Sequence, residues 1–145
     1  MSTTNTGKSL EIDARGPRFS ALLTTVVLAI ALVTGSVWVA AFQAVVFAIG
    51  ATKGPQFTPY AFIYRSLIKP RLKSSLRTED VRPPKFAQSI GLAFAIVAIV
   101  GAATGSSVVF SVAVAAALAA AFLNAAFDFC LGCQVYLILA RLRSA

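Results

Sequence analysis

The chain has no histidine, only two cysteines and only five acidic residues among its 145 residues. The absence of histidine removes the commonest general base and the commonest metal ligand of proteins. With 13 lysines and arginines, the scarcity of acids gives a net charge of +8. In a soluble protein this balance would suggest nucleic-acid binding, but no segment resembles a recognition helix or an RNA-binding strand. We therefore expect no nucleic-acid partner, and we expect no bound cofactor.

Charge is also missing from two long stretches, residues 19–52 and 86–127. All charged residues fall in three blocks, 1–18, 53–85 and 128–145. A soluble domain needs polar faces along its whole length, whereas a charge at the centre of a bilayer costs about 2.5–3.5 kcal/mol. The chain is 58% hydrophobic with a mean hydropathy of +0.82. These features predict an integral membrane protein whose main partner is the lipid bilayer.

Each uncharged stretch is far longer than the roughly 20 residues that one helical crossing needs. Thr34-Gly35-Ser36 interrupts the first stretch, and Thr104-Gly105-Ser106-Ser107 interrupts the second. Glycine accepts a positive φ and serine bonds the neighbouring backbone, so both segments favour turns. We predict an all-α, four-helix membrane bundle made of two helical hairpins.

The predicted boundaries follow from these breaks. The segments are a polar, mobile N-terminus (1–17), a first hairpin (18–52, helices 18–34 and 37–52), a basic cytoplasmic loop with an interfacial segment (53–85), a second hairpin (86–128, helices 86–104 and 107–128) and a basic amphipathic tail (129–145).

The distribution of lysine and arginine favours hairpins over single crossings. One crossing per stretch would place the first two basic blocks on opposite sides of the membrane, against the positive-inside rule. Two hairpins place every basic block in the cytoplasm and both uncharged Gly-Ser turns outside. We predict a multi-pass protein of the bacterial inner membrane with both termini in the cytoplasm. Re-entrant half-hairpins satisfy the same rule and are the alternative.

The two halves of the chain also look like copies of one another. Residues 17–19 (Pro-Arg-Phe) match residues 84–86 (Pro-Lys-Phe), Gly35 matches Gly105, and Phe57 matches Phe127. Both units start on the same side of the membrane. The repeat would therefore be parallel, with a pseudo-twofold axis along the membrane normal. The alternative is chance similarity between apolar segments.

Basic residues beside aromatic rings predict contacts with the membrane surface or with a partner. Residues 57–65 mix aromatic rings with a cation, as interfacial segments do. We expect these segments to connect helices at the membrane surface, or to dock an anionic lipid or a cytoplasmic partner. The candidate residues are Arg65, Lys69, Arg71, Lys73, Arg141 and Arg143.

Both cysteines lie in one C-x-x-C motif, Cys130-Leu131-Gly132-Cys133. This spacing brings two thiols within bridging distance, as disulfide exchange requires. A helix that begins near Leu131 would favour the thiolate of Cys130. We therefore predict that the pair exchanges electrons or sulfur with a soluble thiol partner, with Cys130 as the nucleophile and Cys133 as the resolving thiol. The predicted cytoplasmic position is reducing, so we expect a cycling dithiol and no permanent disulfide.

Asp128 is the third candidate catalytic residue, as a proton acceptor or partner of a thiol. Its alternative role is an ion pair with Arg141 or Arg143. The cysteines also have structural alternatives, because cysteine packs as a small hydrophobe and two chains together could supply four thiolates to zinc. Such a zinc site would require a homo-oligomer.

Two other functions are compatible with the sequence. One is a non-enzymatic scaffold or accessory subunit of a membrane complex. The other is a small permease for a neutral or sulfur-containing solute, which would need a water-accessible path near Gln43 and Asn124. Those two amides otherwise form hydrogen bonds across helices.

Several segments together resemble a known family. They are residues 12–19, 43–50, 69–72, 82–88 and 129–136, the last of which reads Phe-Cys-Leu-Gly-Cys-Gln-Val-Tyr. These resemble the small bacterial integral membrane proteins grouped as domain of unknown function 4395, from about Ile12 to Leu142. Members commonly carry Glu where Gln134 stands here, which weakens any mechanism that needs an acid after Cys133. The resemblance implies a thioredoxin-like or sulfurtransferase partner but assigns no catalytic residue.

Overall fold

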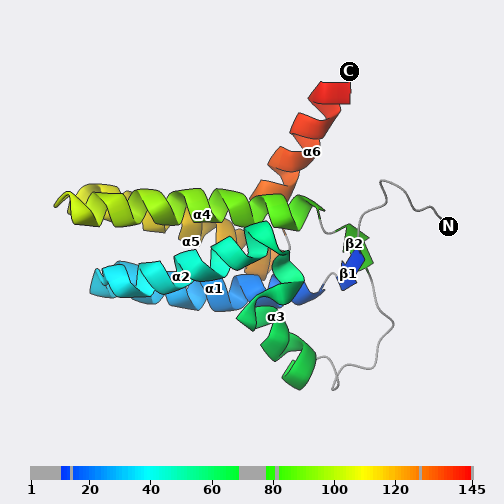
Figure 1. Cartoon of the computed structure of the whole chain (residues 1–145), viewed down its shortest axis with the longest axis horizontal. Helices are drawn as coiled ribbons and strands as arrows, with labels where there is room; N and C mark the ends of the chain where they lie inside the picture. Colours follow the sequence, from blue (N-terminus) through cyan, green and yellow to red (C-terminus); the bar gives the residue numbers. More distant parts are fainter. Residues whose placement is uncertain (1–10, 14, 69–77, 81, 128, 145) are drawn as a thin grey trace.

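The computed structural model describes residues 11–13, 15–68, 78–80, 82–127 and 129–144. Four long helices dominate it (Figure 1). The elements are β1 (Glu11–Asp13), α1 (Arg15–Thr34), α2 (Val37–Thr52), the 3-10 helix η1 (Pro55–Phe57), α3 (Pro59–Ile63), the π-helical turn η2 (Tyr64–Ile68), β2 (Thr78–Asp80), α4 (Arg82–Ala103), α5 (Ser107–Phe127) and α6 (Leu131–Ser144).

Two glycine turns separate the long helices. Gly35 between α1 and α2 has a φ of 67°, and Gly105 between α4 and α5 has a φ of 86°. These left-handed conformations favour glycine because a Cβ would clash there. Ser36 and Ser106 cap the following helices, since their hydroxyls accept hydrogen bonds from Val39 N (3.4 Å) and Val109 N (3.2 Å). Both turns lie at the same end of the molecule (Figure 1).

Helices α1 and α4 begin earlier than the sequence suggested. The expected starts are residues 18 and 86, whereas the helices start at Arg15 and Arg82. Pro17, placed in the N-terminal segment, and the Pro83-Pro84 pair, placed in the basic loop, lie in the first helical turns. Proline is tolerated there because the first N–H groups of a helix have no intrahelical partner.

A short antiparallel ladder joins the segments that precede these two helices. Strand β1 pairs with β2, with Glu11 opposite Asp80 and Asp13 opposite Thr78. Among the described residues these are the strands of an otherwise helical chain. The ladder ties residues 11–13, expected to be mobile, to the basic loop.

The long helices pack so that α1 contacts α2 and α5, while α4 contacts α2 and α5. Small side chains dominate the core and let the helix axes approach closely. The core residues are Leu28, Ala31, Ala40, Phe47, Ala95, Ala98, Phe110, Ala113, Val114 and Ala117.

Large apolar side chains cover the outside of the bundle. Val33, Trp38 and Val108 are 85%, 81% and 70% exposed. A contiguous apolar surface of this kind is unfavourable in water and suits lipid. Helices α1, α4 and α5 are long and apolar enough to cross a membrane, and α2 is a shorter apolar helix of 16 residues.

Candidate functional site

Cys130 directly precedes helix α6 (Leu131–Ser144). Its Sγ accepts a hydrogen bond from Cys133 N at 3.1 Å, and its carbonyl oxygen accepts one from Gln134 N at 3.0 Å. The sulfur thus takes the place that a serine or threonine oxygen usually takes at the start of a helix. The helix begins at Leu131, as the sequence analysis expected. The N–H group and the positive end of the helix dipole both face the sulfur of Cys130.

The two cysteines are joined by a disulfide, with their Cα atoms 5.1 Å apart. This separation lies inside the range that an unstrained backbone allows for a bridge. The bridging distance expected from the C-x-x-C spacing is therefore present, and the structure shows the oxidised form of the pair. Both residues are half-buried.

Gly132 brings the first turn of α6 directly onto α4. A Cβ at this position would lie 2.5 Å from Ala87 Cβ and 2.6 Å from Ala87 Cα. No residue larger than glycine fits without a shift of one helix. One turn further along, the rings of Tyr136 and Phe86 lie 5.6 Å apart. These contacts hold the disulfide beside the start of α4.

Arg18 anchors the segment that leads into Cys130. Its Nε donates to the carbonyl of Ala125 at 3.1 Å, and its Nη2 donates to that of Ala126 at 3.4 Å. The last carbonyls of a helix have no intrahelical donor and carry the negative end of the dipole, so a cation is favourable there. Arg18 on α1 therefore fixes the end of α5, a few residues before the disulfide.

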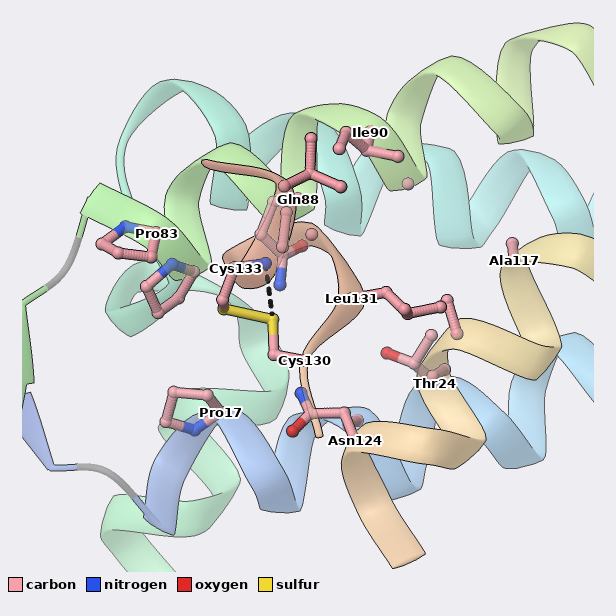
Figure 2. Close-up of a pocket in the computed structure, with 18 of the residues that line it drawn as sticks. Pro17, Thr24, Pro83, Gln88, Ile90, Ala117, Asn124, Cys130, Leu131 and Cys133 are labelled. Atoms are coloured by element: carbon pink, nitrogen blue, oxygen red, sulfur yellow. Dashed lines mark hydrogen bonds between the residues drawn. A yellow bond between two sulfur atoms is a disulfide. The ribbon is translucent and has the colours of Figure 1, made fainter. Parts of the chain in front are cut away.

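A cavity of about 730 Å³ lies beside the disulfide. It is lined by residues of α1, α4, α5 and α6 and by Phe47 of α2. The volume falls within the range of about 300–1,000 Å³ that is usual for small-molecule sites. In Figure 2 the disulfide lies among Pro17, Pro83 and Asn124, at the end of α1 and α4 from which both helices start.

A few polar side chains also line this cavity. They are Arg18, Thr24, Gln88 and Asn124, besides Gln134. Gln88 Oε1 is buried and has no hydrogen-bond partner among the described residues. Arg18 is the charged residue among those that line the cavity. The sequence analysis singled out Asn124 but missed Gln88 and Arg18. Asn124 was singled out as an amide within an uncharged stretch. Gln88 lies just inside the same stretch, so the same criterion would have found it.

Gln43, the other amide expected in a solute path, is not in the cavity. It is 0% exposed, and its Oε1 accepts a hydrogen bond from the Tyr60 hydroxyl at 2.7 Å. Its Nε2 has no partner among the described residues. Burial raises the pKa of Tyr60 to about 12, because the phenolate would lose its hydration. Gln43 thus joins α2 to α3.

The predicted surface residues are only partly described. Arg65 is exposed and donates to the carbonyl of Gln56, while Arg141 and Arg143 are exposed in the last turn of α6. Four candidates, namely Lys69, Arg71, Lys73 and Asp128, lie outside the described residues. Within the described ranges, no group of three or more His, Cys, Asp or Glu side chains could hold a metal ion.

Apolar helices of membrane-spanning length and a cysteine pair at a helix start define a helical membrane protein with a candidate thiol site. Residues 12–141 match the family model described as domain of unknown function (DUF4395). The chain belongs to this family, as the resemblance in its sequence suggested. No curated protein and no solved structure matches the chain.

Proposed function

We propose that this protein is a membrane-embedded thiol–disulfide exchange protein that acts through Cys130 and Cys133. In the reduced protein, Cys130 attacks a disulfide of a soluble partner, and a Cys130–partner disulfide forms as the partner's other sulfur leaves as a thiol. Cys133 then attacks Cys130 Sγ, which forms the internal disulfide and releases the partner's second thiol. Two electrons and two protons thus pass from the pair to the partner. A partner dithiol drives the same steps in reverse: it leaves as a disulfide and returns Cys130 and Cys133 to thiols.

The observation that carries this proposal is the hydrogen bond from Cys133 N to Cys130 Sγ at the start of α6. An N–H donor and a helix N-terminus both stabilise a thiolate, which is the form that attacks a disulfide. Cys130 is therefore a better nucleophile and a better leaving group than Cys133. Arg18 adds a positive charge to the same cavity. A merely structural cysteine would need none of these features.

The test compares the two single-cysteine variants. We expect purified Cys133→Ser protein to react with glutathione disulfide at least about tenfold faster than Cys130→Ser protein, because only the former keeps the sulfur at the helix start. The same Cys133→Ser variant, expressed in its membrane, should trap a mixed disulfide that reductant releases. Equal, slow rates for both variants, together with no trapped partner, would overturn the proposal.

The proposed setting is a four-helix bundle in which both helical hairpins cross the bacterial inner membrane. Three observations support it. The two glycine turns lie at one end of the bundle, while the arginines that begin α1 and α4 and helix α6 lie at the other (Figure 1). Contacts of α1 with α5 are mirrored by contacts of α4 with α2. The surface of the bundle is apolar. The end that carries the disulfide is then the cytoplasmic one.

A scaffold or accessory role is the second candidate, and one observation favours it. The outer part of α6 leaves the bundle (Figure 1) and exposes Ile138 and Leu142 by 53% and 66%. This role predicts a complex that survives loss of both thiols. The permease is disfavoured, because the solvent-excluded Gln43 does not line the cavity with Asn124.

A further inference from the structure

We propose that the cavity beside the disulfide binds a lipid-soluble quinone, which takes electrons from the reduced Cys130–Cys133 pair. This inference rests on the proposed thiol–disulfide function and names the second reactant of the same site. A dithiol–disulfide couple that accepts electrons from a soluble partner must pass them on. The structure places a space of small-molecule size directly against the two sulfurs.

The shape of the cavity favours a molecule that enters from lipid. Its walls run along α4 from Ala87 to Phe94 and along α5 from Asn124 to Ala117. Seven residues of helix correspond to about 10 Å at roughly 1.5 Å per residue. The cavity thus extends from the disulfide well into the uncharged part of the bundle, where a water-soluble reactant would lose its hydration.

The deep part of the cavity is apolar and aromatic. Phe47 and Phe94 line it together with four alanines of α5, namely Ala116, Ala117, Ala120 and Ala121. Runs of small residues such as this one usually let helices pack closely. Near the turn, α4 and α5 do pack closely, since a Cβ at Gly101 would lie 2.6 Å from Val109 Cγ1. Farther along, the same small residues leave space for a flat apolar ring.

The shallow end offers polar groups to the oxygens of such a ring. Gln88 lines the cavity, although its Oε1 is buried against α2, where a Cβ on Gly50 would meet it at 2.7 Å. In Figure 2, Gln88 and Asn124 lie on opposite sides of the disulfide. The Gln88 amide nitrogen is therefore the atom of this side chain that can donate to one quinone carbonyl. The amide of Asn124 can donate to a quinone carbonyl.

The dithiol–disulfide couple and the hydroquinone–quinone couple each exchange two electrons and two protons. The two thiols lose two electrons and two protons as the S–S bond forms. The quinone gains both electrons, and the protons end on its two ring oxygens, which gives the hydroquinone. No further oxidant is needed. A lipid acyl chain would fit the apolar walls but could accept no electrons.

The experiment uses the full-length protein in phospholipid nanodiscs, with dithiothreitol as reductant and a one-isoprene benzoquinone as probe. Loss of the quinone absorbance measures the rate. The rate of the Cys130→Ser/Cys133→Ser protein is subtracted, since dithiothreitol alone reduces quinones slowly. We expect turnover above this background in the wild type. Ala120→Leu should lower it by about tenfold or more, because the added side chain occupies the cavity.

Ala119→Leu is the matched control, since Ala119 is exposed on the same helix and does not line the cavity. It should leave the rate unchanged. A photoreactive azidoquinone, which needs no variant to fold, should label residues 83–94 or 116–134 of the wild type. Absence of turnover and of labelling, in a protein that still exchanges with glutathione disulfide, would overturn the quinone site alone. Lack of exchange with glutathione disulfide would instead remove the proposed function.

Discussion

Tyr60 and Gln43 form a buried polar pair that joins α3 to α2. The hydroxyl of Tyr60 donates to Gln43 Oε1, whereas Gln43 Nε2 has no partner among the described residues. Tyr60→Phe would remove the hydrogen bond to Oε1 as well. We expect a loss of about 1–3 kcal/mol in the free energy of unfolding, measured by thermal unfolding in detergent. The double variant Tyr60→Phe/Gln43→Leu should regain much of this loss, and a double variant worse than Tyr60→Phe would contradict the explanation.

The same tyrosine sets a pH dependence. Its folded-state pKa of about 12 is above the ordinary value of 10.0, so the folded protein holds the phenol proton more tightly. This stabilisation is complete below pH 10 and is lost as the pH rises toward 12. The melting temperature should therefore fall more steeply over this interval in the wild type than in Tyr60→Phe.

Gly132 decides how closely the disulfide approaches α4. Gly132→Ala would place a Cβ 2.5 Å from Ala87 Cβ, so α6 must move. We expect a loss of roughly 1–3 kcal/mol in stability and a slower reaction of Cys130 with glutathione disulfide. Gly16→Ala is the control, because its Cβ would meet only Tyr64 Cδ2 at 3.9 Å. Equal effects of the two changes would show that close approach is not the reason for glycine.

Helices α3 and α6 have matching starts in the two halves of the chain. Thr58 caps α3 by accepting a hydrogen bond from Ala61 N at 3.2 Å, as Cys130 accepts one from Cys133 N. The ring of Phe19 packs at a tilt against Tyr64, as that of Phe86 packs against Tyr136. The geometry therefore pairs Thr58 with Cys130. This alignment differs by two residues from the sequence match of Phe57 with Phe127.

The two starts differ in how tightly they are packed. Thr58 and Ala61 are 2% and 6% exposed, whereas Cys130 and Cys133 are half-buried and line the cavity. The start of α3 is thus tightly packed, whereas the start of α6 leaves a space beside two sulfurs. Both cysteines of the chain and the cavity therefore lie together at the start of α6.

Arg18 joins the start of α1 to the end of α5, and its loss should loosen the approach to Cys130. Arg18→Gln removes charged hydrogen bonds to two α5 carbonyls, worth about 1 kcal/mol at an exposed position. Amide hydrogen exchange in the last turn of α5 should then rise roughly fivefold. Lys85→Gln is the control, because it removes the same charge at the matching position of α4 and leaves the Arg18 bonds in place. Equal exchange in both variants would contradict the anchoring role.

The whole molecule separates its uncharged turns from its basic ends. Ser107 lies beside a glycine turn, and Ser66 lies near the other end of the bundle. If both hairpins cross the membrane, these two positions lie on opposite sides of it. In a Cys130→Ser/Cys133→Ser background, Ser107→Cys should react with an impermeant maleimide in intact cells. Ser66→Cys should react only after permeabilisation. Both positions are exposed, so burial does not interfere. Labelling of both variants from outside would exclude the proposed topology.

Much of this architecture follows from local properties of the chain. Uncharged stretches, Gly-Ser turns and the C-x-x-C spacing predict apolar helices, reversals and bridged thiols, because each depends on neighbouring residues or on solvation of single side chains. The helix starts at Arg15 and Arg82 were missed because proline marks a loop end and a first helical turn equally well. Asp128, a candidate from the sequence, lies outside the described residues.

The cavity, the anchoring by Arg18 and the burial of the Gln88 oxygen against α2 depend on residues that are far apart in the chain. Arg18 and Ala125 are separated by 107 positions, and the cavity is shared by helices from both halves. Local propensity and hydropathy carry no information about which helices meet, or about where small side chains leave a space. Those outcomes depend on the packing of complete helices, which the order of residues along one helix does not specify.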